Sequence, residues 1–183
     1  MKKSPVVLVV AIGIGAALFF VLGRFVAIPS PIPNTNISLQ YGLLGFMAAL
    51  FGPIAGLLIA FIGHALVDFS YGWGIWWSWV IASGFTGLLM GLCAKAVALD
   101  KDPFNGKKVL TFNIYQVVAN VVAWVIIAPV LDILIYKEPA NKVFLQGLFA
   151  ALANSITTAV VGTLLCFAYS KAKPAAGSLK KEG

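Results

Sequence analysis

GPIAGLLIAFIGHALVD, residues 52–68, is a stretch with no charge before its final residue, the acid Asp68. Proline is well tolerated in the first turn of a helix, so Pro53 favours a helix that begins here. About 20 consecutive apolar residues are needed to cross the hydrocarbon core of a bilayer. The stretch is close to that length, and it therefore predicts a membrane-spanning helix.

Long uncharged windows recur along the rest of the chain, separated by short groups of charged residues. They predict spans at about residues 5–25, 38–51, 53–69, 74–97, 109–132 and 142–170. The second window is short, and the break at Gly52-Pro53 could instead kink one long helix, which would give five spans. The sequence favours six. Residues 1–170 are therefore predicted to form a single six-helix transmembrane domain, and residues 171–183 a flexible basic cytoplasmic tail.

The composition indicates the same fold class, an all-α membrane protein. Of the 183 residues, 61% are hydrophobic and only 10% are charged. Soluble domains carry about 25% charged residues, which they need to solvate their surfaces. A water-soluble globular protein is therefore excluded, and the short connections leave no room for a separate soluble catalytic domain.

The positions of the basic residues predict how the chain is oriented. The formal net charge of +7 would suit nucleic acid, but the lysines gather at the predicted membrane edges, so we expect no nucleic-acid partner. With six spans and a cytoplasmic N-terminus, all basic residues except Arg24, Lys137 and Lys142 lie on the cytoplasmic side. Cytoplasmic loops carry an excess of Lys and Arg. Both termini are therefore predicted to be cytoplasmic, because five spans would place the C-terminal lysines outside.

The stretch quoted first also carries a stripe along one helix face, formed by Gly52, Gly56, Ala60, His64 and Asp68 at every fourth position. Its small residues suit close contact with another helix. Its outer end holds a histidine and an acid one turn apart, which can reach each other or a shared ligand. Two interpretations are open: the two side chains serve only to pair with each other, or they bind a ligand. The two interpretations are compatible.

Polar and aromatic residues from five predicted elements converge in the outer half of the membrane. Amides in spans more often join helices than bind ligands, and tryptophans often form an interfacial belt. The convergence nevertheless predicts an outward-facing site for a small, polar, aromatic molecule, because polar groups within a membrane are costly. The predicted substrate-binding residues are Asn34, Asn36, His64, Asp68, Tyr71, Trp73, Trp77, Gln116, Asn120, Trp124, Gln146 and Asn154.

The first predicted span carries small residues at Ala11, Gly13, Gly15 and Ala17. Small residues four positions apart let another helix approach closely, either within the chain or from a partner membrane protein. The chain has no glycine-rich phosphate loop with a lysine, so it is not an ATPase. Its single histidine excludes a multi-histidine metal site. We predict no catalytic residues and no metal ligands.

Six motifs extend this interpretation: AIGIGAA at 11–17, GRF at 23–25, PNTNI at 33–37, FGPIAG at 51–56, GHA at 63–65 and WWSWVIASG at 76–84. Together they resemble the substrate-binding membrane subunit, or S component, of an energy-coupling factor (ECF) transporter. The resemblance covers about residues 5–170. It is to the subgroup that is related to riboflavin S components and assigned to hydroxymethylpyrimidine, a thiamine precursor.

This resemblance implies partners and a mechanism. An S component captures a vitamin from outside the bacterial plasma membrane and associates with a transmembrane coupling protein (T component) and two cytoplasmic ATPases. Toppling of the S component in the bilayer then delivers the ligand inside. The partner ATPases use ATP and Mg, so the resemblance implies a non-catalytic chain that binds no cofactor itself. The family's docking motif on the first helix matches Ala11, Gly13, Gly15 and Ala17, with Gly in place of some Ala.

Hydroxymethylpyrimidine is the leading ligand, and riboflavin, pyridoxine and thiamine are alternatives within the same class of function. A different class also stays open on the sequence: a stand-alone channel or facilitator, or a structural partner of another membrane complex.

Overall fold

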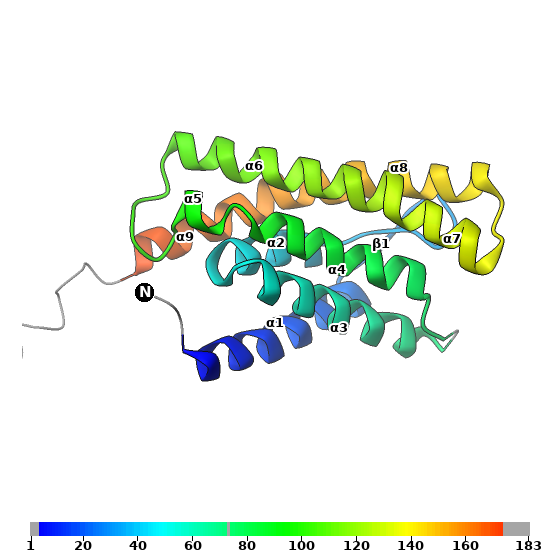
Figure 1. The fold of residues 1–183 in the computed structure, drawn as a ribbon, viewed down its shortest axis with the longest axis horizontal. Coiled ribbons are helices and arrows are strands. Elements are labelled where there is room, and N and C mark those ends of the chain that lie inside the picture. Colours follow the sequence, from blue (N-terminus) through cyan, green and yellow to red (C-terminus); the bar gives the residue numbers. More distant parts are fainter. Residues whose placement is uncertain (1–3, 73, 174–183) are drawn as a thin grey trace, which may run out of the picture.

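The chain folds into a helical bundle in the computed structural model, which describes residues 4–72 and 74–173 (Figure 1). Within these ranges, five helices are long and apolar enough to cross a membrane. They are α1 (Pro5–Phe25), α3 (Pro53–Tyr71), α4 with α5 (Trp77–Gly91 and Ala94–Val97), α6 to α7 (Gly106–Val121, η1 Val122–Ile127, Ala128–Tyr136) and α8 to α9 (Ala140–Thr157, η2 Thr158–Gly162, Thr163–Ala172). The predicted helical class of membrane protein is confirmed.

The break at Gly52-Pro53 separates two helices rather than kinking one. The shorter helix, α2 (Gln40–Phe51), ends where Gly52 adopts a φ of 91°, a value that L side chains rarely adopt. Pro53 then opens α3. A helix of 12 residues is about 18 Å long, well short of the roughly 30 Å hydrocarbon core. By its length α2, although apolar, is not a full span, so the six-span topology stays a prediction.

Local sequence explains how α1 starts and how closely α3 and α4 pack. The Ser4 side chain accepts a hydrogen bond from the Val7 backbone N–H at 3.3 Å, and Pro5 occupies the first turn. Between α3 and α4, a Cβ atom added at Gly56 would lie 2.2 Å from the carbonyl oxygen of Gly87. The small-residue stripe predicted on this helix therefore does bring two backbones together.

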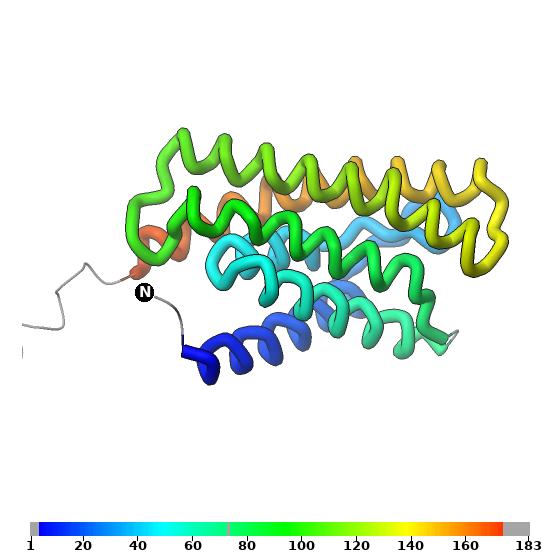
Figure 2. The backbone as a smooth tube through the Cα atoms, in the orientation of Figure 1, coloured from blue at the N-terminus to red at the C-terminus, as the bar shows by residue number. Residues whose placement is uncertain are grey.

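Two of the long helices contain a π-helical segment, η1 between α6 and α7 and η2 between α8 and α9. The helical conformation nevertheless runs without interruption through each segment, and Figure 2 shows this clearly for the stretch from α6 to α7. The wider turn of a π-helix shifts the register of the residues around it, and such segments often occur at functional sites. In this chain η1 carries Trp124, one of the predicted binding residues.

Between α1 and α2, the proline-rich segment predicted as a loop forms a minimal antiparallel hairpin. Strand β1 (Ile28–Pro29) pairs with β2 (Asn36–Ile37), with Ile28 opposite Ile37. The turn is closed by Ser30 and Thr35, whose hydroxyl oxygens lie 2.6 Å apart. The hairpin lies near the end of the bundle where α7 and α8 meet (Figure 1).

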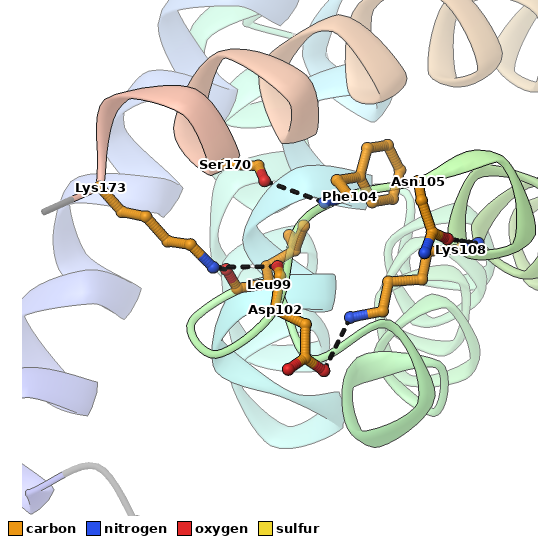
Figure 3. A network of polar contacts seen from close by, with 7 residues as sticks. All are labelled: Leu99, Asp102, Phe104, Asn105, Lys108, Ser170 and Lys173. Carbon is orange, nitrogen blue, oxygen red and sulfur yellow. Dashed lines mark hydrogen bonds and ion pairs between the residues drawn. The ribbon is translucent and has the colours of Figure 1, made fainter. Parts of the chain in front are cut away.

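At the opposite end of the bundle, the last helix is tied to the loop before α6 (Figure 3). The Lys173 ammonium group donates to the carbonyl oxygens of Leu99 and Asp102, each at 2.9 Å. Lys108 lies 3.0 Å from the Asp102 carboxylate, and this hydrogen bond and charge lower the pKa of Asp102. Helix α9 therefore continues to Ala172, beyond the predicted span end at residue 170. The predicted tail from residue 174 onward lies outside the described residues.

Two apolar clusters fill the bundle. The larger one lies among α1 to α4 and η1 and includes Phe19, Leu44, Ile59 and Trp124. The smaller one lies near the lysine-bearing end and includes Val97, Phe104 and Phe112, with both cysteines, Cys93 and Cys166, buried in it. The polar cavity described below lies beyond the larger cluster, toward the hairpin end.

Candidate ligand-binding cavity

A cavity of about 290 Å³ opens at the hairpin end of the bundle. Its size is near the lower end of the roughly 300–1,000 Å³ typical of small-molecule sites. Residues from the hairpin region and from the helical segments α1, α2, α3, α4, η1, α7 and α8 or their ends line it: Gly23, Asn34, Thr35, Asn36, Ser38, Gln40, Tyr41, His64, Val67, Asp68, Tyr71, Trp76, Trp79, Trp124, Asp132, Lys142, Gln146, Ala150 and Asn154. Polar groups therefore converge at one end of the bundle, from segments far apart in the sequence.

The cavity has a wall of aromatic rings. The indoles of Trp79 and Trp124 stack, with centroids 5.7 Å apart and planes 23° apart. Tyr41 meets Trp124 edge-on at 5.4 Å, and its hydroxyl group hydrogen-bonds the Ser83 hydroxyl at 3.1 Å. Rings held this firmly offer a preorganised surface on which a flat ring can pack.

Two carboxylates hold the start of α4 against the cavity. Asp132, which is 2% exposed, accepts hydrogen bonds from the Ser78 hydroxyl and from the indole N–H groups of Trp76 and Trp79. Asp68 accepts from the Trp76 backbone N–H at 2.9 Å. The first backbone N–H groups of a helix lack partners within it, and an acid near them is favoured by the helix dipole. Asp132 therefore fixes the indoles of Trp76 and Trp79, and Asp68 fixes the backbone just before α4.

The predicted pair of His64 and Asp68 lines the cavity beside its aromatic wall. His64 Nε2 is 3.5 Å from Asp68 Oδ1, and its ring centroid is 6.4 Å from that of Trp124. The other ring nitrogen, Nδ1, is buried and has no hydrogen-bond partner among the described residues. The pair therefore meets only part of the hydrogen-bonding capacity of His64.

The hairpin forms the outer rim of the cavity. Asn34 has a φ of 58°, in the left-handed region where asparagine is one of the better tolerated residues. The Gln146 amide donates to the Pro33 carbonyl oxygen at 2.8 Å and so fastens the hairpin to α8. Asn36 and Asn154 also line the cavity, as does Lys142, whose ammonium group lies 2.7 Å from Glu138.

The predicted amide stripe on α6 lies behind the wall and not on it. Asn120 is fully buried, and its oxygen accepts from the Trp124 indole N–H at 3.1 Å. Its amide nitrogen donates to Gln116 Oε1 at 3.1 Å, and Gln116 donates to the Ser155 carbonyl oxygen at 3.2 Å. The spacing placed these amides on one face as expected, but that face points between α6 and α8, where Gln116 and Asn120 orient Trp124.

Of the predicted tryptophans Trp124 lines the cavity, but the ones that line it from the start of α4 are Trp76 and Trp79 and not Trp77. Trp77 is 44% exposed and packs on Phe61, with centroids 6.0 Å apart. Because α4 begins at Trp77, residues 76 and 79 share the face toward Asp132, and Trp77 is turned away from it. Trp73 was also predicted, and it lies outside the described residues.

Sequence reasoning missed Gln40, Tyr41, Trp76, Trp79 and Asp132 as cavity residues. Asp132 carried a usable signal, because an acid at a membrane span needs hydrogen-bond donors and the tryptophan-rich segment supplies them. Gln40 and Tyr41 open α2 beside the cavity, but nothing in their spacing distinguished them. The predicted residues that do line the cavity are Asn34, Asn36, His64, Asp68, Tyr71, Trp124, Gln146 and Asn154.

The four small residues of α1 fall on two sides of the helix. Ala11 and Gly15 are buried, and a Cβ atom added at Gly15 would lie 2.6 Å from Ile59 Cδ1 of α3. Gly13 and Ala17 are exposed, and an added Cβ at Gly13 would meet nothing within 4 Å. One half of the motif packs within the chain, and the other half is free for a neighbouring membrane helix.

Comparison with known proteins supports the fold. The S component for biotin from an ECF-type ABC transporter has a similar structure, with a TM-score of 0.62 and 16% identity over 97% of this chain and 93% of that chain. Among sequence relatives, a UPF0397 protein of Lacticaseibacillus casei (strain BL23) is 51% identical, covering 99% of this chain and 97% of that protein. A UPF0397 protein of Lactococcus lactis subsp. cremoris (strain NZ9000) is 54% identical over the full length of both.

A family model supplies the assignment that the fold alone does not. Residues 3–171 match the family described as the ECF-type riboflavin transporter, S component. This match takes in the whole cavity lining and the described helices up to the end of α9, whose last residue, Ala172, lies just beyond it. The chain therefore belongs to the family of ECF-type riboflavin transporter S components, integral membrane subunits that work with a coupling protein and ATPases.

Proposed function

We propose that this S component captures a small aromatic vitamin or vitamin precursor from outside the cell, with hydroxymethylpyrimidine as the leading ligand. One observation carries the proposal: a cavity at one end of the bundle combines stacked indoles with buried carboxylates and amides. Such a combination suits a flat ring with polar substituents. Riboflavin and pyridoxine are the alternative ligands.

The charge distribution supports an outward-facing cavity. Lysines lie on or beside α5, the start of α6 and α9, at the end of the bundle opposite the hairpin that lines the cavity (Figure 1): Lys95, Lys101, Lys107, Lys108 and Lys171. Basic residues favour the cytoplasmic side of a membrane. We therefore infer six membrane segments, with α2 as a short one, and both termini in the cytoplasm of a bacterial plasma membrane.

Binding is the step that this chain performs. Its ligand enters between the hairpin and the start of α4 and is delivered inward when the subunit topples within the bilayer. Energy for this comes from the two ATPases, which bind ATP and Mg, through the coupling protein. The exposed half of the α1 motif, Gly13 and Ala17, is the part of this chain available to dock on that protein.

A stand-alone channel is less well supported. Tyr41 and Trp124 of the cavity wall and Phe19 pack together within the larger apolar cluster, and the smaller cluster fills the other end of the bundle. A channel needs a polar path through the bundle, whereas these residues pack against one another. The arrangement favours a binding site that is open at one end.

The proposal is tested by native mass spectrometry of the purified subunit and by isothermal titration with hydroxymethylpyrimidine, riboflavin and pyridoxine. We expect one ligand per chain and tightest binding of hydroxymethylpyrimidine. Co-purification with the coupling protein and ATPases provides the second measurement. Tighter binding of riboflavin would replace the leading ligand, and a chain that conducts solutes without partners would refute the binding role.

A further inference from the structure

Two side-chain atoms of the cavity lining are buried without a hydrogen-bond partner among the described residues: Gln40 Oε1 and His64 Nδ1. Thr158 Oγ1 is in the same condition, but it lies away from the cavity. An unpaired buried polar atom costs about 1–3 kcal/mol, and native proteins contain few of them. Two such atoms on residues of one cavity point to groups that a ligand satisfies.

We assign both atoms as acceptors from their surroundings. Gln40 is 8% exposed, and its Oε1 is a carbonyl oxygen. His64 Nε2 faces the Asp68 carboxylate at 3.5 Å. A neutral imidazole that directs its Nε2–H at the carboxylate has a lone pair on Nδ1, which then accepts a hydrogen bond. The ligand must therefore bring donors.

The Gln40 amide packs closely against α1. Its oxygen lies against Gly23, where an added Cβ atom would be only 1.8 Å away. Gly23 also lines the cavity, so the absence of a side chain there keeps the space that the amide occupies. The last torsion of a glutamine side chain is soft, and rotation about it costs little.

The charged groups of the lining disfavour an anion. Asp68 and Asp132 both lie on the wall, and both already accept hydrogen bonds from α4. Lys142 is on the lining too, but its ammonium group is paired with Glu138 at 2.7 Å. An anionic substituent would therefore approach two carboxylates with no unpaired lysine of the lining to offset them, and like charges a few Å apart repel strongly in a poorly solvated site.

We propose that the cavity selects a flat heterocycle that donates N–H or O–H groups to Gln40 and His64 and carries no anionic group. This inference rests on the proposed function, and it narrows that function to a ligand class. It assigns Gln40 as a specificity-determining residue. A phosphorylated or carboxylated form of a suitable ring is rejected, whereas the free amino- or hydroxyl-bearing form is accepted.

Isothermal titration of the purified full chain tests the inference with four probes: hydroxymethylpyrimidine, its monophosphate, riboflavin and biotin. We expect hydroxymethylpyrimidine to bind, and its monophosphate and biotin to bind at least about tenfold more weakly. Gln40→Leu keeps the side-chain bulk and removes the acceptor, so it should weaken hydroxymethylpyrimidine binding about tenfold. Thr158→Val removes the unpaired atom outside the cavity, and it should leave the affinity unchanged.

A measurement on the unchanged protein covers the case in which Gln40→Leu fails to fold. A hydroxymethylpyrimidine analogue without its amino group should bind the natural chain about tenfold more weakly. Equal affinity for this analogue, or an undiminished affinity of folded Gln40→Leu, would overturn the acceptor assignment. Equal or tighter binding of the monophosphate or biotin would overturn the charge selection and leave the transport role standing. If no probe binds to a chain that still co-purifies with its coupling protein, the ligand class is wrong and the transport role again stands.

Discussion

Leucine substitutions at Gly13 and Gly15 should separate docking from folding, although the two glycines are only two residues apart on α1. A Cβ atom at Gly15 would lie 2.6 Å from Ile59 Cδ1, 2.9 Å from Ile59 Cγ1 and 3.2 Å from Met47 Cε. At Gly13 it would meet nothing within 4 Å. Because two residues along a helix point to opposite sides, the same change has different neighbours at each position.

The neighbours of each glycine determine how much a leucine there changes the stability of the fold. Ile59 is fully buried in α3, so it has little freedom to move away from a new side chain at Gly15. Overpacking of this kind costs about 1–3 kcal/mol. For a domain of this size, each kcal/mol shifts the melting temperature by about 2–4 °C, so Gly15→Leu should lower Tm by roughly 2–12 °C. Gly13→Leu should change stability by only about 0.5 kcal/mol.

The assay compares both variants in detergent by thermal unfolding, by ligand titration and by co-purification with the coupling protein. We expect Gly13→Leu to keep its Tm and ligand affinity but to lose most of the co-purified partner, because leucine disrupts a smooth helix surface. Gly15→Leu should instead lose stability. A normal Tm for Gly15→Leu would refute the packing argument, and full partner recovery with Gly13→Leu would refute the docking face.

Three further predictions concern other parts of the molecule. Asp132→Asn should lower stability by about 1–3 kcal/mol, because charge-assisted hydrogen bonds become neutral ones; unchanged Tm and ligand affinity would contradict this. Asn120→Leu leaves the Trp124 indole N–H unpaired, so it should weaken ligand binding several-fold and shift tryptophan fluorescence; an unaltered spectrum would refute the positioning role. Lys108 lowers the pKa of Asp102 from 3.8, so this pair stabilises the fold above about pH 3.8 and its contribution is lost on further acidification. Asp102→Asn should therefore reduce the loss of Tm below that pH, and identical pH profiles would count against the pair.

The helical class and most helix positions were predictable because the local sequence is enough to specify a membrane helix. Uncharged windows of sufficient length, with charges and prolines between them, gave helix ends within a few residues at Pro5, Phe51 and Pro53. The hydrogen bonds of a helix lie within the segment itself, so no distant partner is needed to specify it. The hairpin at Ile28–Pro29 and Asn36–Ile37 was predicted only as a loop, since its pairing joins residues across a turn.

The sequence predicted where the cavity lies, but it predicted only some of the residues that line it. The i to i+4 spacing correctly placed His64 beside Asp68, and both line the cavity. The same spacing placed Asn120 in line with Trp124, but Asn120 is buried behind the cavity and bonds Gln116 and Trp124 of its own helix. Helix periodicity tells which residues share a face, and it does not tell which neighbour that face meets.

The sequence by itself predicted a lipid-embedded helical bundle with most of its lysines at one end and a group of polar side chains near the other. The length of each apolar segment and the positions of the charges follow directly from the sequence. They are also what decides whether a segment crosses a bilayer and which side its ends face. Only the tertiary structure decided that Asp132 holds Trp76 and Trp79, and that Gln40 lies against Gly23 with an unpaired oxygen. These contacts depend on how helices rotate and approach one another, which is set by packing among all of them at once.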